Sequence, residues 1–401
     1  MSMARIRAGL LQVGALVPFD VYNSSGRLLL RRGHSVESEQ QLDRLVESGL
    51  YDPASAQAHS TYAGGPSRVV HEFAHLPSQS LRNRVSVFER LADAARDLDG
   101  LSSLEPTAPG FEAGIRSITA TVRECCALDS DAALAHVLLF EASRYSLRHS
   151  LNAALLTALL LGRLHHDADR IDSAVGAALT MNLSIFGLQD TLYRQQEPLT
   201  SEQRLALRLH PGESVKALRS FGVQDPVWLQ VVEQHHEARD GSGYPAGLKD
   251  PAICREAQVV SLVDRYCSMV SQRAYRAALS PRTAIKDLHQ RAASAIDPAL
   301  VGALISALGL FPPGACVRLA NGETAIVVRR LIDPKHPVVY ALHQGTTAPY
   351  ETPKKRLTAG HREYEIVADV KPEAVRVKID PEVLWPPSAT GEAASADPST
   401  E

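Results

Sequence analysis

The sequence predicts a mainly α-helical protein, with a helical core between a small α+β unit and a small β-rich unit. Between residues 81 and 308, apolar side chains recur every three or four positions through successive segments, which is the helical spacing. Before and after that stretch, short apolar runs are separated by turn residues, as is typical of strands. Because 401 residues exceed the usual size of one compact core, we expect several domains.

Residues 1–52 are expected to form the small α+β domain. Apolar stretches flank the turn from Asn23 to Gly26, which predicts a β-hairpin. Residues 38–50 then have helical spacing and end near Gly49. Residues 53–80 are rich in small residues, histidine and proline, so we interpret them as a linker.

The middle of the chain is expected to contain a helical lead-in, residues 81–139, and a larger helical domain, residues 140–310. The expected helices are 85–98, 111–126, 131–141, 145–164, 171–186, 201–221, 227–237, 257–270, 281–289 and 298–308. After Pro312 and Pro313 the pattern changes, and residues 311–385 are expected to form the β-rich domain. Its expected strands are 316–319, 324–330, 338–342 and 364–367. Residues 386–401, rich in Ala, Ser, Pro and Glu, are predicted to be a disordered tail.

The composition excludes several broad classes of protein. Apolar residues make up 45% and charged residues 22%, which is ordinary for a soluble protein. A net charge of −3 favours neither nucleic acid nor an anionic membrane as a partner. No run reaches the roughly 18 apolar residues that a membrane span needs. The five cysteines form no CxxC pair or secreted framework, so we expect reduced thiols and a cytoplasmic location.

One motif combines metal-ligand residues with a shaped loop. His235, His236 and Glu237 are followed by a glycine-rich turn from Asp240 to Leu248. Neutral imidazole is the commonest protein ligand for metals, and neighbouring histidines can address one metal centre. The glycines of the turn permit positive φ, and its proline fixes the exit of the chain. The motif therefore predicts a histidine site beside a tight loop.

This motif resembles the signature of the HD-GYP family, whose active members are metal-dependent phosphodiesterases that hydrolyse cyclic di-GMP. Residues 145–150 resemble the family's YTYxHS helix, and residues 210–218 resemble its HPxxGxxxL helix. Residues 263–266 resemble its VaDvyD segment. Residues 271–276 match the SxRPYR stretch, except that Ala274 replaces proline. The resemblance covers roughly residues 140–308 and implies an HD-type helical core.

The resemblance also implies a set of metal ligands. By alignment with the family motifs they are His149, His210, His235, His236 and Asp264. One divalent ion, iron, manganese or another, could be held by a subset of them; alternatively, hydrogen bonds in the core could satisfy all five. Glu237 and Asp240 could cap the turn or orient the histidines as hydrogen-bond acceptors.

The family's central His-Asp pair is missing from this sequence. By alignment, Met181 stands where the family has His, Asn182 where it has Asp, and Ile185 where it has Lys. In the family the Asp carboxylate lies between two cations and screens their repulsion, whereas the Asn amide has no charge. A thioether is a weak ligand for hard cations, and Ile removes a cation that could steady phosphate charge. We therefore expect impaired hydrolysis.

A literal His-Asp dipeptide occurs elsewhere, at His166 and Asp167. It lies only 17 residues after His149, in a polar connection between two expected helices. In the family the pair falls inside the next apolar helix, which selects Met181 and Asn182 instead. We interpret His166 and Asp167 as a solvated surface feature.

Three residues are candidates for contact with a nucleotide. Arg273 and Arg276 stand where family members contact phosphate, and guanidinium groups suit that task; they could also be a solvated pair at a helix end. Tyr244, within the motif Gly243, Tyr244 and Pro245, could pack against a guanine or a partner protein, or simply plug the loop. The resemblance also suggests a diguanylate cyclase or another signalling protein as a partner.

Three functions are compatible with these features. The first is a degenerate HD-GYP protein that binds nucleotide or partner proteins in cyclic di-GMP signalling with little or no hydrolysis. The second is an active metal-dependent cyclic di-GMP phosphodiesterase with an altered metal centre. The third is a scaffolding module that binds no nucleotide. The replaced residues Met181, Asn182 and Ile185 count against the second function, and Arg273 and Arg276 count against the third.

Overall fold

The computed structural model divides the chain into two compact units, Met1–Arg84 and Val85–Glu401. It describes residues 84–105, 107–291, 294–345, 348–371 and 380–389, with Val375, Val377 and isolated positions before residue 84. The predicted linker at 53–80 lies outside the described residues, as do positions 390–401 of the predicted tail. Within that tail, Ser388–Ala389 forms the short strand β11.

The described part of the first unit is a four-stranded sheet. Its strands are β1 (Ala4–Arg5), β2 (Val21–Tyr22), β3 (Leu28–Leu30) and β4 (Leu50–Tyr51), in the order β1-β4-β2-β3. Strands β2 and β3 pair antiparallel, with Val21 opposite Leu30, so the hairpin expected around Asn23 to Gly26 is present. Most of the helix expected at 38–50 lies outside the described residues.

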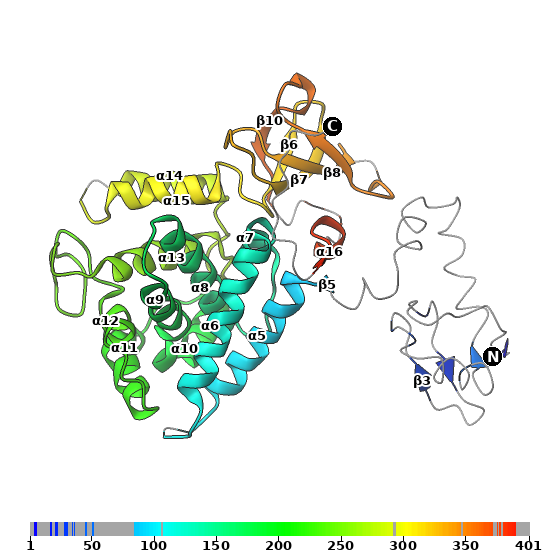
Figure 1. Cartoon of the computed structure of the whole chain (residues 1–401). Coiled ribbons are helices and arrows are strands. Elements are labelled where there is room, and N and C mark those ends of the chain that lie inside the picture. Colours follow the sequence, from blue (N-terminus) through cyan, green and yellow to red (C-terminus); the bar gives the residue numbers. More distant parts are fainter. Residues whose placement is uncertain are drawn as a thin grey trace. The chain divides into compact units, whose positions relative to one another are not determined.

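The second unit is mainly helical, which confirms the predicted fold class (Figure 1). After the short strand β5 (Arg84–Val85), its helices are α5 (Val87–Ser102), α6 (Phe111–Leu128), α7 (Ser130–Leu139), α8 (Tyr145–Arg163), α9 (Ala168–Thr180), the 3₁₀ turn η1 (Leu183–Ile185), α10 (Phe186–Arg194), α11 (Ser201–Ser220), α12 (Pro226–Gln234), α13 (Arg255–Val270), α14 (Pro281–Arg291) and α15 (Pro298–Leu308).

Helix α8 is the centre of this unit. It contacts α5, α6, α7, α9, α10, α13 and α15, and its leucine-rich and alanine-rich sequence is buried on nearly every side. Small residues such as Ala153 and Ala154 let the surrounding helices approach closely. A polar side chain on such a helix costs free energy unless it finds a partner inside the fold.

The β-rich region forms an antiparallel sheet at one end of the helices (Figure 1). Its strands are β6 (Cys316–Leu319), β7 (Glu323–Arg329), β8 (Val338–Gln344), β9 (Lys354–Leu357) and β10 (Ile366–Asp369), in the order β10-β6-β7-β8-β9. The 3₁₀ turn η2 (Arg362–Tyr364) precedes β10, and the short helix α16 (Pro381–Leu384) precedes β11.

Side chains on the two faces of this sheet pack into two different hydrophobic cores. Val317, Val327 and Val339 face a small core of their own, whereas Ile326 and Val328 join the core of the helices. The C-terminal segment adds to the helical core as well. Trp385 is 2% exposed, contacts Phe88 of α5 and donates its indole N–H to the Val328 carbonyl at 3.0 Å.

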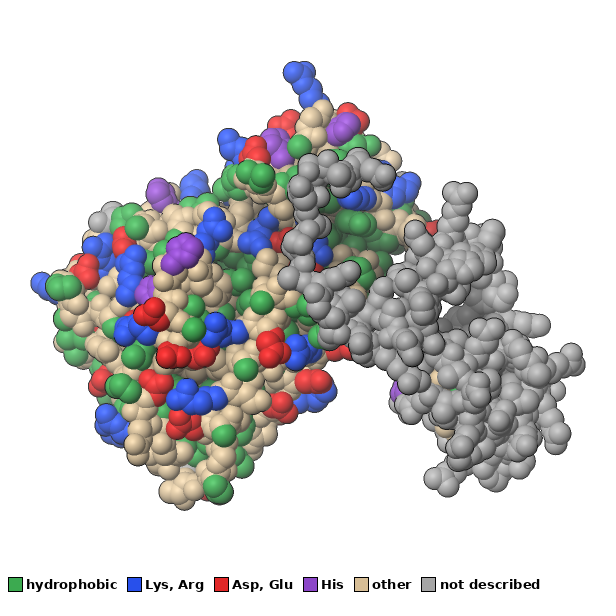
Figure 2. All heavy atoms as spheres, in the orientation of Figure 1, with side chains coloured by type: hydrophobic (Ala, Val, Ile, Leu, Met, Phe, Trp, Pro, Cys, Tyr) green, Lys and Arg blue, Asp and Glu red, His purple; other side chains and the backbone are tan. Residues whose placement is uncertain are grey.

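The distribution of charged side chains and the burial of the apolar segments agree with what the composition predicts. On the face shown in Figure 2, basic and acidic side chains are interspersed over the helical unit. One segment, Ala168–Arg194, is long and apolar enough to cross a membrane, but 72% of its most apolar window is buried within the fold. It includes α9, which packs against α8 and α12, and therefore serves as a core segment.

Candidate functional site

A cavity of about 490 Å³ is open between α8, α10, α11, α13 and the glycine-rich loop. Residues from several elements line it, and they include most of those singled out from the sequence: His149, Asn182, Ile185, His210, His236, Tyr244, Asp264 and Arg273. Residues far apart in the chain thus converge on one space, as expected for a binding site.

His210 is oriented by the proline that follows it. Pro211 lies within α11 and has no N–H to pair with the carbonyl four residues earlier, at Leu207. That free carbonyl accepts a hydrogen bond from His210 Nδ1 at 2.7 Å. The His210 Nε2 atom therefore carries the lone pair and is available as a ligand.

His235 is oriented in the same way by the end of a helix. Helix α12 ends at Gln234, so the Val232 carbonyl in its last turn has no helical partner. It accepts a hydrogen bond from His235 Nδ1 at 2.7 Å. The Nε2 atoms of His210 and His235 then lie 3.1 Å apart, both with lone pairs. Two lone pairs at that distance repel each other unless a proton or a cation lies between them.

The third member of the cluster is His236, whose ring stacks on Tyr244 at a centroid distance of 4.7 Å. The ligand atoms of His210, His235 and His236 all lie within 4.8 Å of one another. Burial lowers the pKa of all three imidazoles, that of His236 to about 4, so they are neutral near pH 7. In a tetrahedral metal complex, ligand nitrogens are about 3.3 Å apart, so these three residues fit one divalent ion.

His149 and Asp264 form a separate pair in the same cavity. His149 Nε2 lies 2.7 Å from Asp264 Oδ1, and Tyr145, one helical turn earlier, places its hydroxyl 3.3 Å from His149 Nδ1. Burial acts to raise the pKa of Asp264, but the His149 hydrogen bond and the nearby imidazoles outweigh it, so the pKa is lowered. The five predicted ligands therefore form a three-histidine cluster and a His-Asp pair.

The three positions where the sequence departs from the family have different surroundings. Met181 is completely buried in the apolar core and is not among the described residues that line the cavity. Asn182 and Ile185, 2% and 6% exposed, do line it. All three follow the end of α9 at Thr180, and Ile185 is the last residue of the short 3₁₀ turn η1, which corrects the expected continuous helix 171–186.

Glu237 and Asp240, which were predicted to cap the turn or to orient the histidines, both form hydrogen bonds within the loop. Glu237 is buried, and its carboxylate accepts the backbone N–H groups of Ala246 and Leu248 at 2.7 and 2.9 Å. Asp240 accepts hydrogen bonds from the N–H and the hydroxyl of Ser242. Both acidic side chains thus hold the loop. A Cβ atom at Gly243 would lie 2.4 Å from the Ala238 nitrogen, so only glycine fits there.

Arg273 and Arg276, the two candidate phosphate-binding arginines, differ in their position relative to the cavity. Arg273 lines the cavity, with Nη2 donating to the Tyr145 hydroxyl at 2.7 Å and its guanidinium 4.9 Å from the ring centroid. Arg276 donates to the Ser268 carbonyl at 2.6 Å and is not among the described lining residues. Ala274, where the family has proline, uses its N–H to bind the Tyr193 carbonyl at 3.0 Å.

The interpretation of His166 and Asp167 as a solvated surface feature holds for Asp167, which is exposed, but not for His166. Its side chain is 18% exposed, and its Nδ1 lies 3.2 Å from the carboxylate of Glu256, which is fully buried and also paired with Arg170. A charge buried at Glu256 needs such partners. His166 nevertheless does not reach the cavity, so it is no alternative to the missing pair.

The site residues that sequence reasoning missed include Tyr145, a partner of His149, and Gln189, a lining residue. The four-residue spacing of Tyr145 and His149 on one helix could have indicated their contact. Gln189 lies on α10, beyond the break at η1, and no pattern in the sequence indicated its position.

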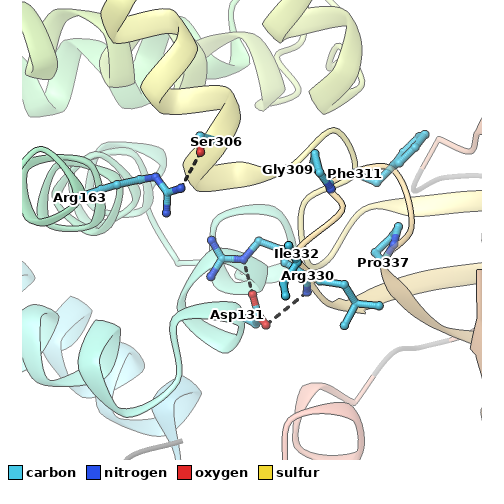
Figure 3. Close-up of a pocket in the computed structure, with 10 residues that line it drawn as sticks. Asp131, Arg163, Ser306, Gly309, Phe311, Arg330, Ile332 and Pro337 are labelled. Atoms are coloured by element: carbon cyan, nitrogen blue, oxygen red, sulfur yellow. Dashed lines mark hydrogen bonds and ion pairs between the residues drawn. The ribbon is translucent and has the colours of Figure 1, made fainter. Parts of the chain in front are cut away.

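A second cavity, of about 430 Å³, lies where α7 and α15 meet the connection after β7 (Figure 3). Arg330 binds the Asp131 carboxylate at 2.5 Å, and Arg163 binds the Ser306 hydroxyl at 2.6 Å. The first contact joins the connection after β7 to α7, and the second joins α8 to α15. Among the described residues that line it there is no histidine, so it offers no comparable metal chemistry.

Comparisons with known proteins identify the class of this site. Residues 141–300 match the sequence model of an HD domain, which spans all five predicted ligands. This HD domain also contains the glycine-rich block after His236. Residues 141–300 therefore form an HD domain, and this region is similar to HD-GYP proteins.

Curated relatives include cyclic dinucleotide phosphodiesterases. The chain is 26% identical over 225 residues to cyclic di-GMP phosphodiesterase PA4108 of Pseudomonas aeruginosa, which covers 55% of this chain and 54% of that protein. It is 28% identical over 171 residues to 3'3'-cGAMP-specific phosphodiesterase 3 of Vibrio cholerae, which covers 42% and 37%. The chain thus spans about half, or less, of the length of these relatives.

A solved structure has the same fold. Bd1817, an HDG"Y"P protein from Bdellovibrio bacteriovorus, superposes with a TM-score of 0.50 at 17% sequence identity. The superposition covers 76% of this chain and 99% of that chain. This similarity supports the helical architecture and says nothing about activity.

Proposed function

We propose that this chain is a degenerate HD-GYP protein that binds a cyclic dinucleotide in the 490 Å³ cavity and hydrolyses it slowly or not at all. The observation that carries the proposal is Asn182, a neutral amide in the wall of the cavity beside the histidines. A pair of close divalent cations needs an anion between them, and the amide provides none.

The positions around Asn182 support the same conclusion. Ile185 contributes an aliphatic chain to the cavity wall instead of a cation. Met181 is turned into the apolar core, where its thioether cannot serve a metal in the cavity. His149 and Asp264 satisfy each other by a hydrogen bond, which leaves the three-histidine cluster as the one complete set of ligands in the described site. A metal held there would supply Lewis acidity at a single point.

Binding of the nucleotide is supported by the remaining residues. Arg273 provides a guanidinium group at the cavity wall, and Tyr244 provides a half-buried aromatic ring. Cyclic dinucleotides carry phosphodiester anions and flat bases, which suit these two groups. Beside Tyr244, the exposed Pro245 and Ala246 at the tip of the loop could contact a diguanylate cyclase or another signalling protein in the cytoplasm.

The test has two parts on the full chain. Calorimetric titration with cyclic di-GMP should show binding, with and without added manganese. Chromatography of overnight reactions with iron or manganese should show no release of linear pGpG or GMP. Metal-stimulated turnover would establish an active phosphodiesterase, the alternative that the three-histidine cluster favours. A folded chain with no nucleotide affinity would instead indicate a scaffolding module.

A further inference from the structure

The cavity contains hydrogen-bonding capacity that the described protein does not use. Three of its lining residues each have one buried polar atom without a partner among the described residues: Asn182 Nδ2, Gln189 Oε1 and Arg273 Nε. Two of these atoms are donors and one is an acceptor. Buried polar groups are normally paired, because an unpaired group loses its hydrogen bonds to water on folding. A ligand in the cavity could complete these three groups.

Several other polar groups of the cavity already have partners. His149 and Asp264 bind each other, and Nδ1 of His210 binds a backbone carbonyl. The free nitrogens of the histidine cluster are available to a metal ion. The buried atoms of the lining that have no partner among the described residues are those at positions 182, 189 and 273. A matching ligand must supply at least two acceptors and one donor. A phosphodiester supplies the acceptors, and a ribose hydroxyl or a base N–H supplies the donor.

We propose that Asn182 anchors the nucleotide directly, by donating its amide N–H to a phosphodiester oxygen, so that a cyclic dinucleotide binds without any metal ion. The replacement of carboxylate by amide then changes the chemistry of the site rather than only damaging it. A carboxylate at this place would add a second negative charge near Asp264 and would repel a phosphate. An amide adds a donor and no charge. Arg273 Nε serves as the second donor, and Gln189 accepts from the ligand.

This inference rests on the proposed function, because it concerns how the same cavity holds the nucleotide. Its test is the affinity of the full chain for cyclic di-GMP in the presence of EDTA. The parent chain should bind under these conditions. Asn182→Asp should weaken binding about tenfold or more, because it removes the donor and adds a repelling charge. Asn182→Ala removes only the donor and should weaken binding by about threefold to tenfold.

A matched control separates the local effect from net charge. Gln224→Glu adds the same negative charge on the exposed turn before α12 and should leave the affinity unchanged. Circular dichroism and thermal unfolding establish that each variant is folded. If Asn182→Asp is unfolded, Asn182→Ala provides the comparison by itself.

The possible outcomes are distinct. Equal affinity of the parent and both Asn182 variants overturns the inference. Binding of the parent only after metal is added also overturns it, while the proposed function stands. A parent chain that binds no cyclic di-GMP under any condition removes the proposed function, and the inference is lost with it.

Discussion

Restoring the family's residues should restore a second metal. The variant combines Met181→His, Asn182→Asp and Ile185→Lys. In the parent, the three-histidine cluster fits one divalent ion, so we expect at most one metal per chain. In the variant, the added carboxylate lies in the cavity wall and can bridge to a second ion near Asp264, so metal content should approach two per chain.

The structure also predicts the cost of this change to the metal-free protein. Met181 is completely buried among apolar side chains, and replacing it with imidazole should cost about 2–3 kcal/mol. Ile185 is 6% exposed but lines the cavity, where a lysine ammonium can reach water, so its replacement should cost about 1–2 kcal/mol. These two replacements together should therefore make the metal-free variant less stable by about 3–5 kcal/mol.

Metal binding should recover much of the lost free energy of unfolding. A second ion at a hundred times its dissociation constant stabilises the folded chain by about 2.7 kcal/mol. Thermal unfolding with EDTA or manganese measures this recovery, and elemental analysis after gel filtration measures stoichiometry. Met181→Leu with Ile185→Met is the matched control, since it repacks the same positions without adding a ligand. If the restored variant holds no more metal than the parent, the placement of the lost centre at positions 181–185 is refuted.

Three further changes test other contacts. Glu237→Gln removes one of two strong acceptors for the glycine-rich loop, and hydrogen exchange of the two amides bound there should accelerate about 10–100-fold. Burial lowers the pKa of His136 to about 3, below the roughly 6.5 of an unfolded chain. The unfolded chain therefore binds more protons between these values, and stability falls as the pH falls. His136→Leu should reduce this acid slope by about 1.4 kcal/mol per pH unit, measured by denaturant unfolding between pH 6 and 4; an unchanged slope would contradict it. Ala274→Pro removes the N–H that binds the Tyr193 carbonyl and should lower the free energy of unfolding by about 1 kcal/mol, so an unaltered denaturation midpoint would count against this contact.

Local patterns predicted the helices well where caps and periodicity agreed. The helix at 298–308 has the expected bounds, because Asp297 caps its start and Gly309 ends it. The helix at 171–186 was predicted to be continuous, but it breaks at Thr180. Its apolar periodicity runs through the break, and the turn is fixed by distant contacts, such as the Ser184 hydroxyl binding the His210 carbonyl. Such contacts leave no trace in a local pattern.

The strand at 354–357 was missed for a different reason. Lys354, Lys355 and Arg356 make it strongly charged, and it lies at the edge of the sheet, where lysines are common and apolar alternation is weak. For the site, family motifs located the residues that converge on the cavity. They could not show that Met181 turns away from it or that Asn182 retains an unused donor. Both facts depend on packing between segments distant in sequence.

The burial of Trp385 determines how this protein can be divided. Because its ring completes the helical core beside Phe88 and its indole binds Val328, the segment around Trp385 packs against α5, the first long helix of the second unit. The chain therefore enters the sheet from helix α15 and returns to the helical core after β10, through the segment that contains Trp385. A fragment ending at residue 310 would lack Trp385 and would expose apolar side chains of α5 to solvent. The helical domain is consequently not separable from the sheet and the C-terminal segment, and domain-swap chimaeras should retain residues 85–389 as one piece.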